Sequence, residues 1–199
     1  MIYDRLIFST NANLQILQES SDWLADGTFK TVPSLFAQLY TIHSTKFNGA
    51  IPLVFALLPN KNQNVYEKFL TALKTLKDGL NPRSIITDYE MAAINSFKNC
   101  FPNMEQKGCF FHFAQSLYRK IQAEELQQRY SNDPGFSLQL RMLAAIAMVP
   151  QDEVVQAFEM LSNSFPAEAQ GVLDYFEDTW IGRPNRHGRR RAPSFPLSL

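Results

Sequence analysis

The chain has 199 residues, of which 45% are hydrophobic and 19% charged, and its formal net charge is +0. This length allows one substantial hydrophobic core, so one main domain is expected. No run approaches the roughly 18 apolar residues of a membrane span, and residues 1–10 lack the features of a secretory signal. We therefore expect an intracellular protein without a membrane partner. Cys100 and Cys109 alone do not support a disulfide framework.

The charge is unevenly distributed along the chain. Residues 181–199 carry +5, whereas the other 180 residues hold 14 basic against 19 acidic side chains. The basic residues of this tail are Arg183, Arg186, Arg189, Arg190 and Arg191. Such a segment can neutralise DNA phosphates without reading sequence. Its three prolines equally fit a solvated, disordered end with no ligand, and disorder is expected here.

The first half of the chain reads as strands around one helix. After a lead-in, the run 23–25 leads to Asp26, residues 35–42 alternate as a strand does, and 51–58 is apolar enough for a strand covered on both faces. Pro52 is expected at the entry of that strand. The helix is indicated by apolar residues at gaps of 4, 4, 3 and 4: Val65, Phe69, Leu73, Leu76 and Leu80.

The second half becomes helical after two more strands. Residues 84–87 predict a buried strand ending at Asp88, 89–99 a helix, and 107–111 a further strand. Helices are then expected at about 112–130, 137–147, 151–162 and 167–179. Three strands, a helix, a strand, a helix and a strand is the order of the ribonuclease H-like fold, an α/β fold with a mixed sheet. The expected organisation is a lead-in (1–20), this core (21–113), an all-helical insertion (114–180) and the basic tail (181–199).

Two aspartates are the main candidate site residues. Asp26 and Asp88 each stand where an apolar run ends, 62 positions apart in the sequence. In a ribonuclease H-like sheet their strands are parallel neighbours, so both carboxylates emerge at one sheet edge, where ligands of open α/β sheets usually bind. Carboxylates suit hard divalent cations. The simpler alternatives are an Asp-Gly turn at Asp26 and a helix cap at Asp88.

Several motifs in order resemble the catalytic domain of Mutator-like element (MULE) transposases. They are Trp-Leu-Ala-Asp-Gly-Thr-Phe-Lys at 23–30, Pro-Leu-Val-Phe-Ala-Leu-Leu-Pro at 52–59, Thr-Asp-Tyr-Glu at 87–90 and Gly-Cys-Phe-Phe-His-Phe at 108–113. The resemblance is strongest to animal members found behind FLYWCH-type zinc fingers. It covers residues from about 7 to 196.

This resemblance implies a DDE-type active site on a ribonuclease H-like core, in a nuclear protein. Asp26 and Asp88 would be the first two metal-binding aspartates, holding two Mg²⁺ or Mn²⁺ ions for attack on a DNA phosphodiester. Glu90 lies near the second acid, but at a helix start it can equally serve the helix dipole, and it is left out of the catalytic set.

The third acid of the family is missing. It belongs to a Thr-Asn-Asn-x-x-Glu segment after the helical insertion, and the sequence contains no such segment. Glu159, Glu168 and Glu177 all precede that point, and none is expected to substitute. The resemblance therefore implies an incomplete or inactive fragment of the enzyme. A domesticated, non-catalytic module that binds DNA or protein is the alternative, and self-association is left open.

A Cys-x-x-His pair, Cys109 and His112, follows the second aspartate, as it does in the related transposases. Tetrahedral zinc requires four ligands, and only Cys100 offers a third. A structural role is therefore expected for the pair, and zinc is not. His43 is interpreted as a hydrogen-bonded core histidine.

Overall fold

The computed structural model describes residues 5–30, 32–46 and 49–198, and divides the chain into two compact units, Met1–Cys109 (unit 1) and Phe110–Leu199 (unit 2). Met1–Asp4 of the lead-in and Leu199 of the tail lie outside the described residues. Within the described part of the chain, no helix is both long and apolar enough to cross a membrane.

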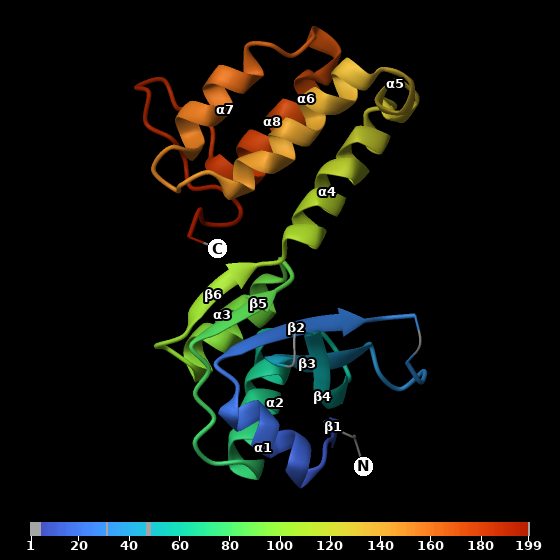
Figure 1. Cartoon of the computed structure of the whole chain (residues 1–199), viewed down its shortest axis with the longest axis vertical. Coiled ribbons are helices and arrows are strands. Elements are labelled where there is room, and N and C mark those ends of the chain that lie inside the picture. Colours follow the sequence, from blue (N-terminus) through green and yellow to red (C-terminus); the bar gives the residue numbers. More distant parts are fainter. Residues whose placement is uncertain (1–4, 31, 47–48, 199) are drawn as a thin grey trace. The chain divides into compact units, whose positions relative to one another are not determined.

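Unit 1 is built on a mixed six-stranded sheet with the order β1-β4-β3-β2-β5-β6 (Figure 1). The strands are β1 (Leu6–Phe8), β2 (Asp22–Thr28), β3 (Gln38–Lys46), β4 (Gly49–Leu58), β5 (Ser84–Thr87) and β6 (Glu105–Gly108). Strand β5 runs parallel to β2 and to β6, and the other pairs are antiparallel. The prediction that the strands leading to Asp26 and Asp88 are parallel neighbours is confirmed.

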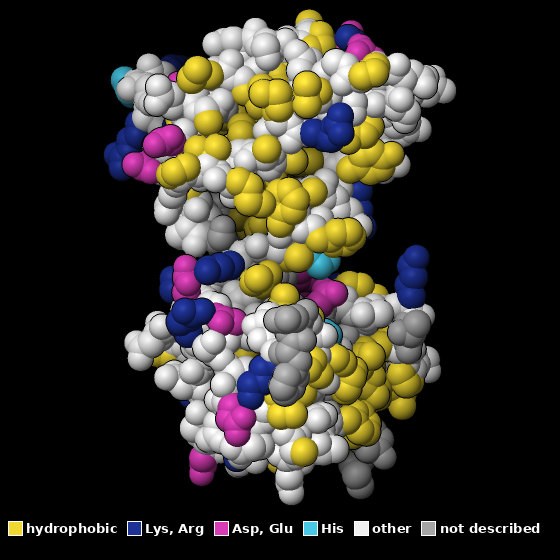
Figure 2. All heavy atoms as spheres, in the orientation of Figure 1, with side chains coloured by type: hydrophobic (Ala, Val, Ile, Leu, Met, Phe, Trp, Pro, Cys, Tyr) yellow, Lys and Arg dark blue, Asp and Glu magenta, His cyan; other side chains and the backbone are white. Residues whose placement is uncertain are grey.

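Three helices supply most of the rest of one hydrophobic core: α1 (Asn11–Glu19), α2 (Gln63–Leu76) and α3 (Met91–Cys100). The period-two alternation of β2 places Trp23 and Ala25 in this core. The Trp23 indole also donates to the carbonyls of Leu17 and Ser20, at 3.2 and 3.1 Å. Elsewhere on unit 1, hydrophobic side chains gather over the β1, β4 and β3 side of the sheet (Figure 2).

The lead-in carries structure that the sequence analysis did not assign. Strand β1 pairs with β4, and Leu14 and Leu17 of α1 join the core. The Ser9 hydroxyl donates to the Leu53 carbonyl at 2.8 Å. Strand β1 is only three residues long, too short for a periodicity signal, so its sequence does not distinguish it from a loop.

Pro52 lies inside β4 and not at its entry, which corrects the expectation. The β3–β4 register shifts between Ile42 and His43, where His43 faces Pro52. This bulge accommodates a residue without an N–H, and the described pairing of β1 with β4 is confined to Phe55–Leu57. The proline therefore removes no donor from a central ladder.

Two further boundaries differ from the expectations. Helix α2 ends at Leu76, which is exposed, and Gly79 then adopts a positive φ of 76°. Leu80 is buried but lies beyond the helix, because a left-handed glycine reverses the chain direction there. Strand β6 ends at Gly108 and α4 begins at Phe110, so the expected strand over 107–111 is wrong in its second half.

Unit 2 contains the helices α4 (Phe110–Ala123), α5 (Gln127–Asn132), α6 (Pro134–Ala145), α7 (Val154–Ser162) and α8 (Gln170–Phe176). A π-helical turn (Glu177–Ile181) extends α8. The expected single helix over 112–130 is broken, because Glu125 has a φ of 60° between α4 and α5. Aromatic contacts form the centre of this unit: Phe113 meets Trp180 at 4.8 Å and Phe158 stacks on Phe176 at 5.3 Å.

The basic tail is folded onto unit 2 at two of its arginines, which differs from the expectation of a disordered end. Arg190 pairs with Glu159 and Glu177, each at 2.7 Å. Arg183 pairs with Asp174 at 3.2 Å and with Asp178 at 2.6 Å. Phe195 stacks on Trp180. The acidic partners lie in α7, α8 and the turn after α8, so the local +5 of the tail is partly neutralised within its own unit.

Candidate functional site: an acidic edge of the sheet

Asp26 and Asp88 emerge at the same edge of the sheet. The parallel β2–β5 register runs from Asp22 opposite Ser84 to Ala25 opposite Thr87, so Asp26 and Asp88 each follow the last pair. Neighbouring strands lie about 4.8 Å apart. Two acidic residues from distant parts of the sequence therefore lie on neighbouring strands, each directly after the end of the parallel register.

The simpler alternatives for the two aspartates do not match the structure. Asp26 lies within β2, which continues to Thr28 and remains paired with β3, so it does not begin a turn. Its Oδ1 accepts from the Gly27 N–H at 2.8 Å. Helix α3 begins at Met91 with Glu90 as its N-cap, so Asp88 is not the cap. Neither aspartate therefore has the role that the simpler alternative gave it.

Glu90 is held by a polar chain that passes into the core. The Gln38 amide donates to the Tyr66 hydroxyl at 2.7 Å, and this hydroxyl donates to Glu90 Oε1 at 3.0 Å. The Glu90 side chain makes no capping hydrogen bond to α3. Its carboxylate therefore faces the core beneath the edge. The alternative that Glu90 stabilises the start of α3 is not supported by a hydrogen bond from its side chain to that helix.

The charges of the edge act on one buried hydroxyl. Tyr40 is fully buried, and its pKa lies well above the ordinary value because of burial, then Tyr66, and then the charges of Asp88, Glu90 and Asp26. Three carboxylates thus lie within electrostatic reach of the Tyr40 hydroxyl.

Glu90 itself is destabilised as an anion. Burial, followed by the charge of Asp88, raises its pKa, while the Tyr66 hydrogen bond and the charge of Lys61 lower it. Lys61 stands over the Phe29 ring, with its Nζ 3.3 Å from the ring centroid. The edge therefore combines negative charge with one nearby exposed cation.

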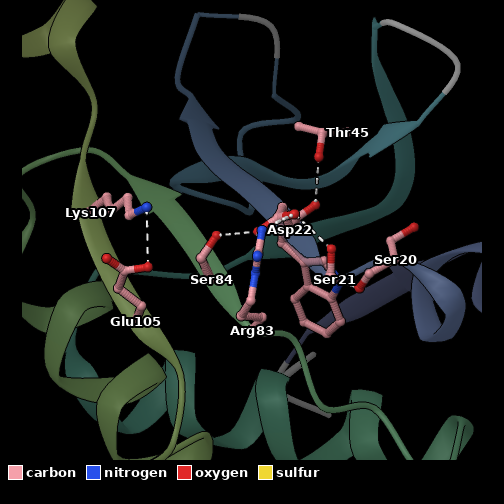
Figure 3. A network of polar contacts seen from close by, with 9 residues as sticks. Ser20, Ser21, Asp22, Thr45, Arg83, Ser84, Glu105 and Lys107 are labelled. Carbon is pink, nitrogen blue, oxygen red and sulfur yellow. Dashed lines mark hydrogen bonds and ion pairs between the residues drawn. The ribbon is translucent and has the colours of Figure 1, made fainter.

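The opposite ends of the same strands are organised differently (Figure 3). Asp22, at the start of β2, accepts from Arg83 at 2.8 and 2.9 Å, from Ser84 at 2.6 Å and from Ser21 at 2.6 Å. These hydrogen bonds, with that of Ser21 the largest contribution, hold the Asp22 pKa well below its usual range. This end of the sheet is a closed structural network.

The remaining candidate residues are placed as follows. Cys109 is half-buried and directly follows β6, with its N–H donating to the Thr87 carbonyl at 2.8 Å. His112 is half-buried in the first turn of α4. His43 is half-buried on β3, and burial lowers its pKa although the charge of Asp26 raises it.

The glutamates considered as a third acid are engaged in unit 2. Glu159 and Glu177 pair with Arg190, and Glu168 pairs with Arg129. Across residues 5–30, 32–46 and 49–198, no group of three acidic, histidine or cysteine side chains is arranged so that it could hold a metal ion.

The comparison with protein families gives one match. Residues 23–116 match the family model of the MULE transposase domain. This part of the chain is therefore similar to a MULE family domain. The matched segment contains Asp26, Asp88, Cys109 and His112, and it supports an origin of the protein from a transposase. No curated protein matches the chain in sequence.

The sequence analysis missed the residues beneath the acidic edge. Gln38, Tyr40 and Tyr66 were not assigned to the site. A signal for the first two exists in the alternation of β3, which places Gln38 and Tyr40 on the buried face with Ile42. Tyr66 neighbours the predicted Val65 position on α2, and only its hydrogen bond to Glu90 places its hydroxyl beside the candidate site.

Proposed function

We propose that the MULE domain descends from the catalytic domain of a ribonuclease H-like DDE transposase and retains a divalent-cation site at Asp26 and Asp88. The observation that carries the proposal is the end of the β2–β5 register, which makes the two aspartates neighbours. The strand order β4-β3-β2-β5-β6, with α2 and α3 as the connections, supports the ribonuclease H-like assignment because it is the order expected for that fold.

The residues at the edge fit a hard cation. Carboxylate oxygens are the ligands that Mg²⁺ and Mn²⁺ prefer. Asp26 lies within β2 and Asp88 directly follows β5, so the sheet holds the backbone at or next to both residues. Two such ions would activate a water or a 3′-hydroxyl and stabilise the leaving oxygen of a phosphodiester. The protein contributes the positioning of Asp26 and Asp88, and the nearby cation Lys61 suits an approaching phosphate.

Calorimetric titration with Mn²⁺ tests the site. We expect Asp26→Asn combined with Asp88→Asn to abolish the binding shown by the unaltered chain, because the site loses both charged ligands. The charge-matched control is Asp152→Asn with Glu153→Gln, two exposed positions of unit 2. Unchanged binding in the first variant would place the cation elsewhere.

DNA binding is proposed to reside in the exposed part of the basic tail. Arg183 and Arg190 are paired with carboxylates, whereas Arg186, Arg189 and Arg191 are exposed. Each phosphate contact adds about 0.9 to the slope of log affinity against log salt. Replacing the three exposed arginines by alanine should weaken retention of a DNA duplex and flatten its salt dependence.

The control for this experiment is a triple alanine variant at Lys98, Arg119 and Arg141, which are exposed cations outside the tail. An equal loss in both variants would show that binding follows net charge alone. Full retention in the tail variant would assign DNA binding to another surface.

A non-catalytic module that binds DNA is the second candidate. It is favoured by the engagement of the later glutamates in ion pairs, since these leave only Asp26 and Asp88 from the family's acid set. Nicking of a labelled duplex with Mg²⁺ or Mn²⁺ separates the two: we expect none from this chain, and nicking that disappears in Asp88→Asn would establish an active enzyme.

A further inference from the structure

The core beneath the acidic edge contains polar atoms that the protein leaves unsatisfied. The Tyr40 hydroxyl, the Thr87 hydroxyl and Gln38 Oε1 are buried, and none of them has a hydrogen-bond partner among the described residues. All three residues are fully buried. A buried polar group without a partner costs about 1–3 kcal/mol, so three together in one region call for an explanation.

These atoms are connected to the edge. Thr87 directly precedes Asp88 at the end of β5, and Gln38 is joined to Glu90 through Tyr66. The Tyr40 ring lies 5.0 Å from the Tyr66 ring, and its hydroxyl feels the charges of all three carboxylates. The unsatisfied groups thus lie on the core side of β5, which leads to Asp88, and of β3, which pairs with the strand of Asp26.

A hydrated cation would account for both sets of groups. Mg²⁺ in proteins keeps several waters and is usually bound directly by one or two carboxylates. Those waters can donate to Gln38 Oε1 and exchange hydrogen bonds with the two hydroxyls. The charge of the ion would also offset the repulsion between the carboxylates of Asp88 and Glu90. Lys61 is a nearby cation that acts on Glu90 in the same direction.

We infer that Glu90 is the third carboxylate of the cation site formed with Asp26 and Asp88, and that it exchanges its hydrogen bond from Tyr66 for the ion when the ion binds. This inference rests on the proposed function, because it needs the aspartate pair as the main ligands. Glu90 would have to turn toward the aspartates, and among the described residues its side chain is held by a hydrogen bond from Tyr66.

Mn²⁺ titration of four forms of the full chain tests the inference. Glu90→Gln keeps the shape and the hydrogen bond to Tyr66 but removes the charge, and we expect binding at least about tenfold weaker. Tyr66→Phe removes the hydrogen bond and leaves the carboxylate, so its binding should equal or exceed that of the unaltered chain. The Asp26→Asn and Asp88→Asn double variant should not bind.

The outcomes separate the inference from the proposal beneath it. Unchanged binding in Glu90→Gln, with loss in the aspartate variant, would overturn the role of Glu90 and leave the aspartate site; the buried atoms would then belong to a water site. Equal loss in Glu90→Gln and Tyr66→Phe would overturn it too, because Glu90 would then act only by supporting the core.

A conservative variant guards against a folding defect. Should Glu90→Gln lose its circular dichroism signal, Glu90→Asp takes its place, since it keeps the charge on a shorter side chain. Glu90→Asp should bind more weakly than the unaltered chain, and Tyr66→Phe should not. Equal binding in all three forms would contradict the inference.

Discussion

The two ends of β2 and β5 carry aspartates in opposite circumstances. At the amino ends, Asp22 is surrounded by donors from Arg83, Ser84 and Ser21. At the carboxyl ends, Asp88 stands next to Asp26 in the register and repels Glu90. The same two strands therefore terminate in a neutralised network at one end and in accumulated negative charge at the other.

The two groups of carboxylates are expected to affect stability in different ways. A carboxylate that accepts several hydrogen bonds contributes to folding, whereas like charges held together cost stability unless a ligand compensates them. Sites of this second kind are typical of functional regions. Removing a carboxylate should accordingly lower stability at the amino ends of the strands and not at their carboxyl ends, and this contrast can be tested.

The largest expected effect on stability is at the neutralised end. Asp22→Ala should lower the free energy of unfolding of unit 1 by about 2 kcal/mol, because it removes charge-assisted hydrogen bonds and leaves Ser84 without its acceptor. Amide hydrogen exchange of peptides from β2 and β5 measures the stability of unit 1 separately from that of unit 2. Glu105→Ala, which removes an exposed ion pair with Lys107, is the control and should change little.

The same variant has a defined pH dependence. The folded pKa of Asp22 is below its ordinary value of 3.8, so its stabilisation is fully present above that pH and is lost as the pH falls through the folded pKa. The difference between Asp22→Ala and the unaltered chain should therefore be constant near neutrality and shrink below about pH 3.8. A difference that persists undiminished in strong acid would contradict the assignment.

A smaller effect distinguishes two tyrosines beneath the acidic edge. Tyr66→Phe breaks the chain from Gln38 to Glu90 and should destabilise unit 1 by about 1 kcal/mol. Tyr40→Phe removes a hydroxyl that has no partner among the described residues, so it should change stability by less than about 0.5 kcal/mol or raise it. The two rings pack against each other, which makes the pair a matched comparison. Equal losses would show that the Tyr40 hydroxyl is satisfied.

The central part of the sheet could be predicted because its signals are local. The apolar run before Asp88 and the alternation near residues 35–42 identify strands directly, and their order implies that β2 and β5 are neighbours. The Pro52 bulge could not be predicted, since a register shift depends on the facing strand and not on β4 alone.

The candidate site was predictable only in its aspartates. Asp26 and Asp88 stand where apolar runs of the sequence end, whereas the environment of Glu90 depends on Tyr66, 24 residues away, and on Gln38 in another strand. In the tail, composition indicated disorder because the carboxylates that pair with Arg183 and Arg190 lie in other parts of unit 2. Pairing between residues far apart in the chain does not produce a periodic pattern in the sequence.

The parallel pairing of β2 with β5 also has a consequence for the order of folding. The residues between them include β3, β4 and α2, so the strands meet only after a long segment has closed, and such non-local contacts form slowly. During synthesis, a nascent chain that has emerged only as far as α2 has Asp26 but not Asp88. Cation affinity at the edge would then arise at a late stage of folding, when β5 docks, and a bound ion would selectively slow the unfolding of chains that have reached it.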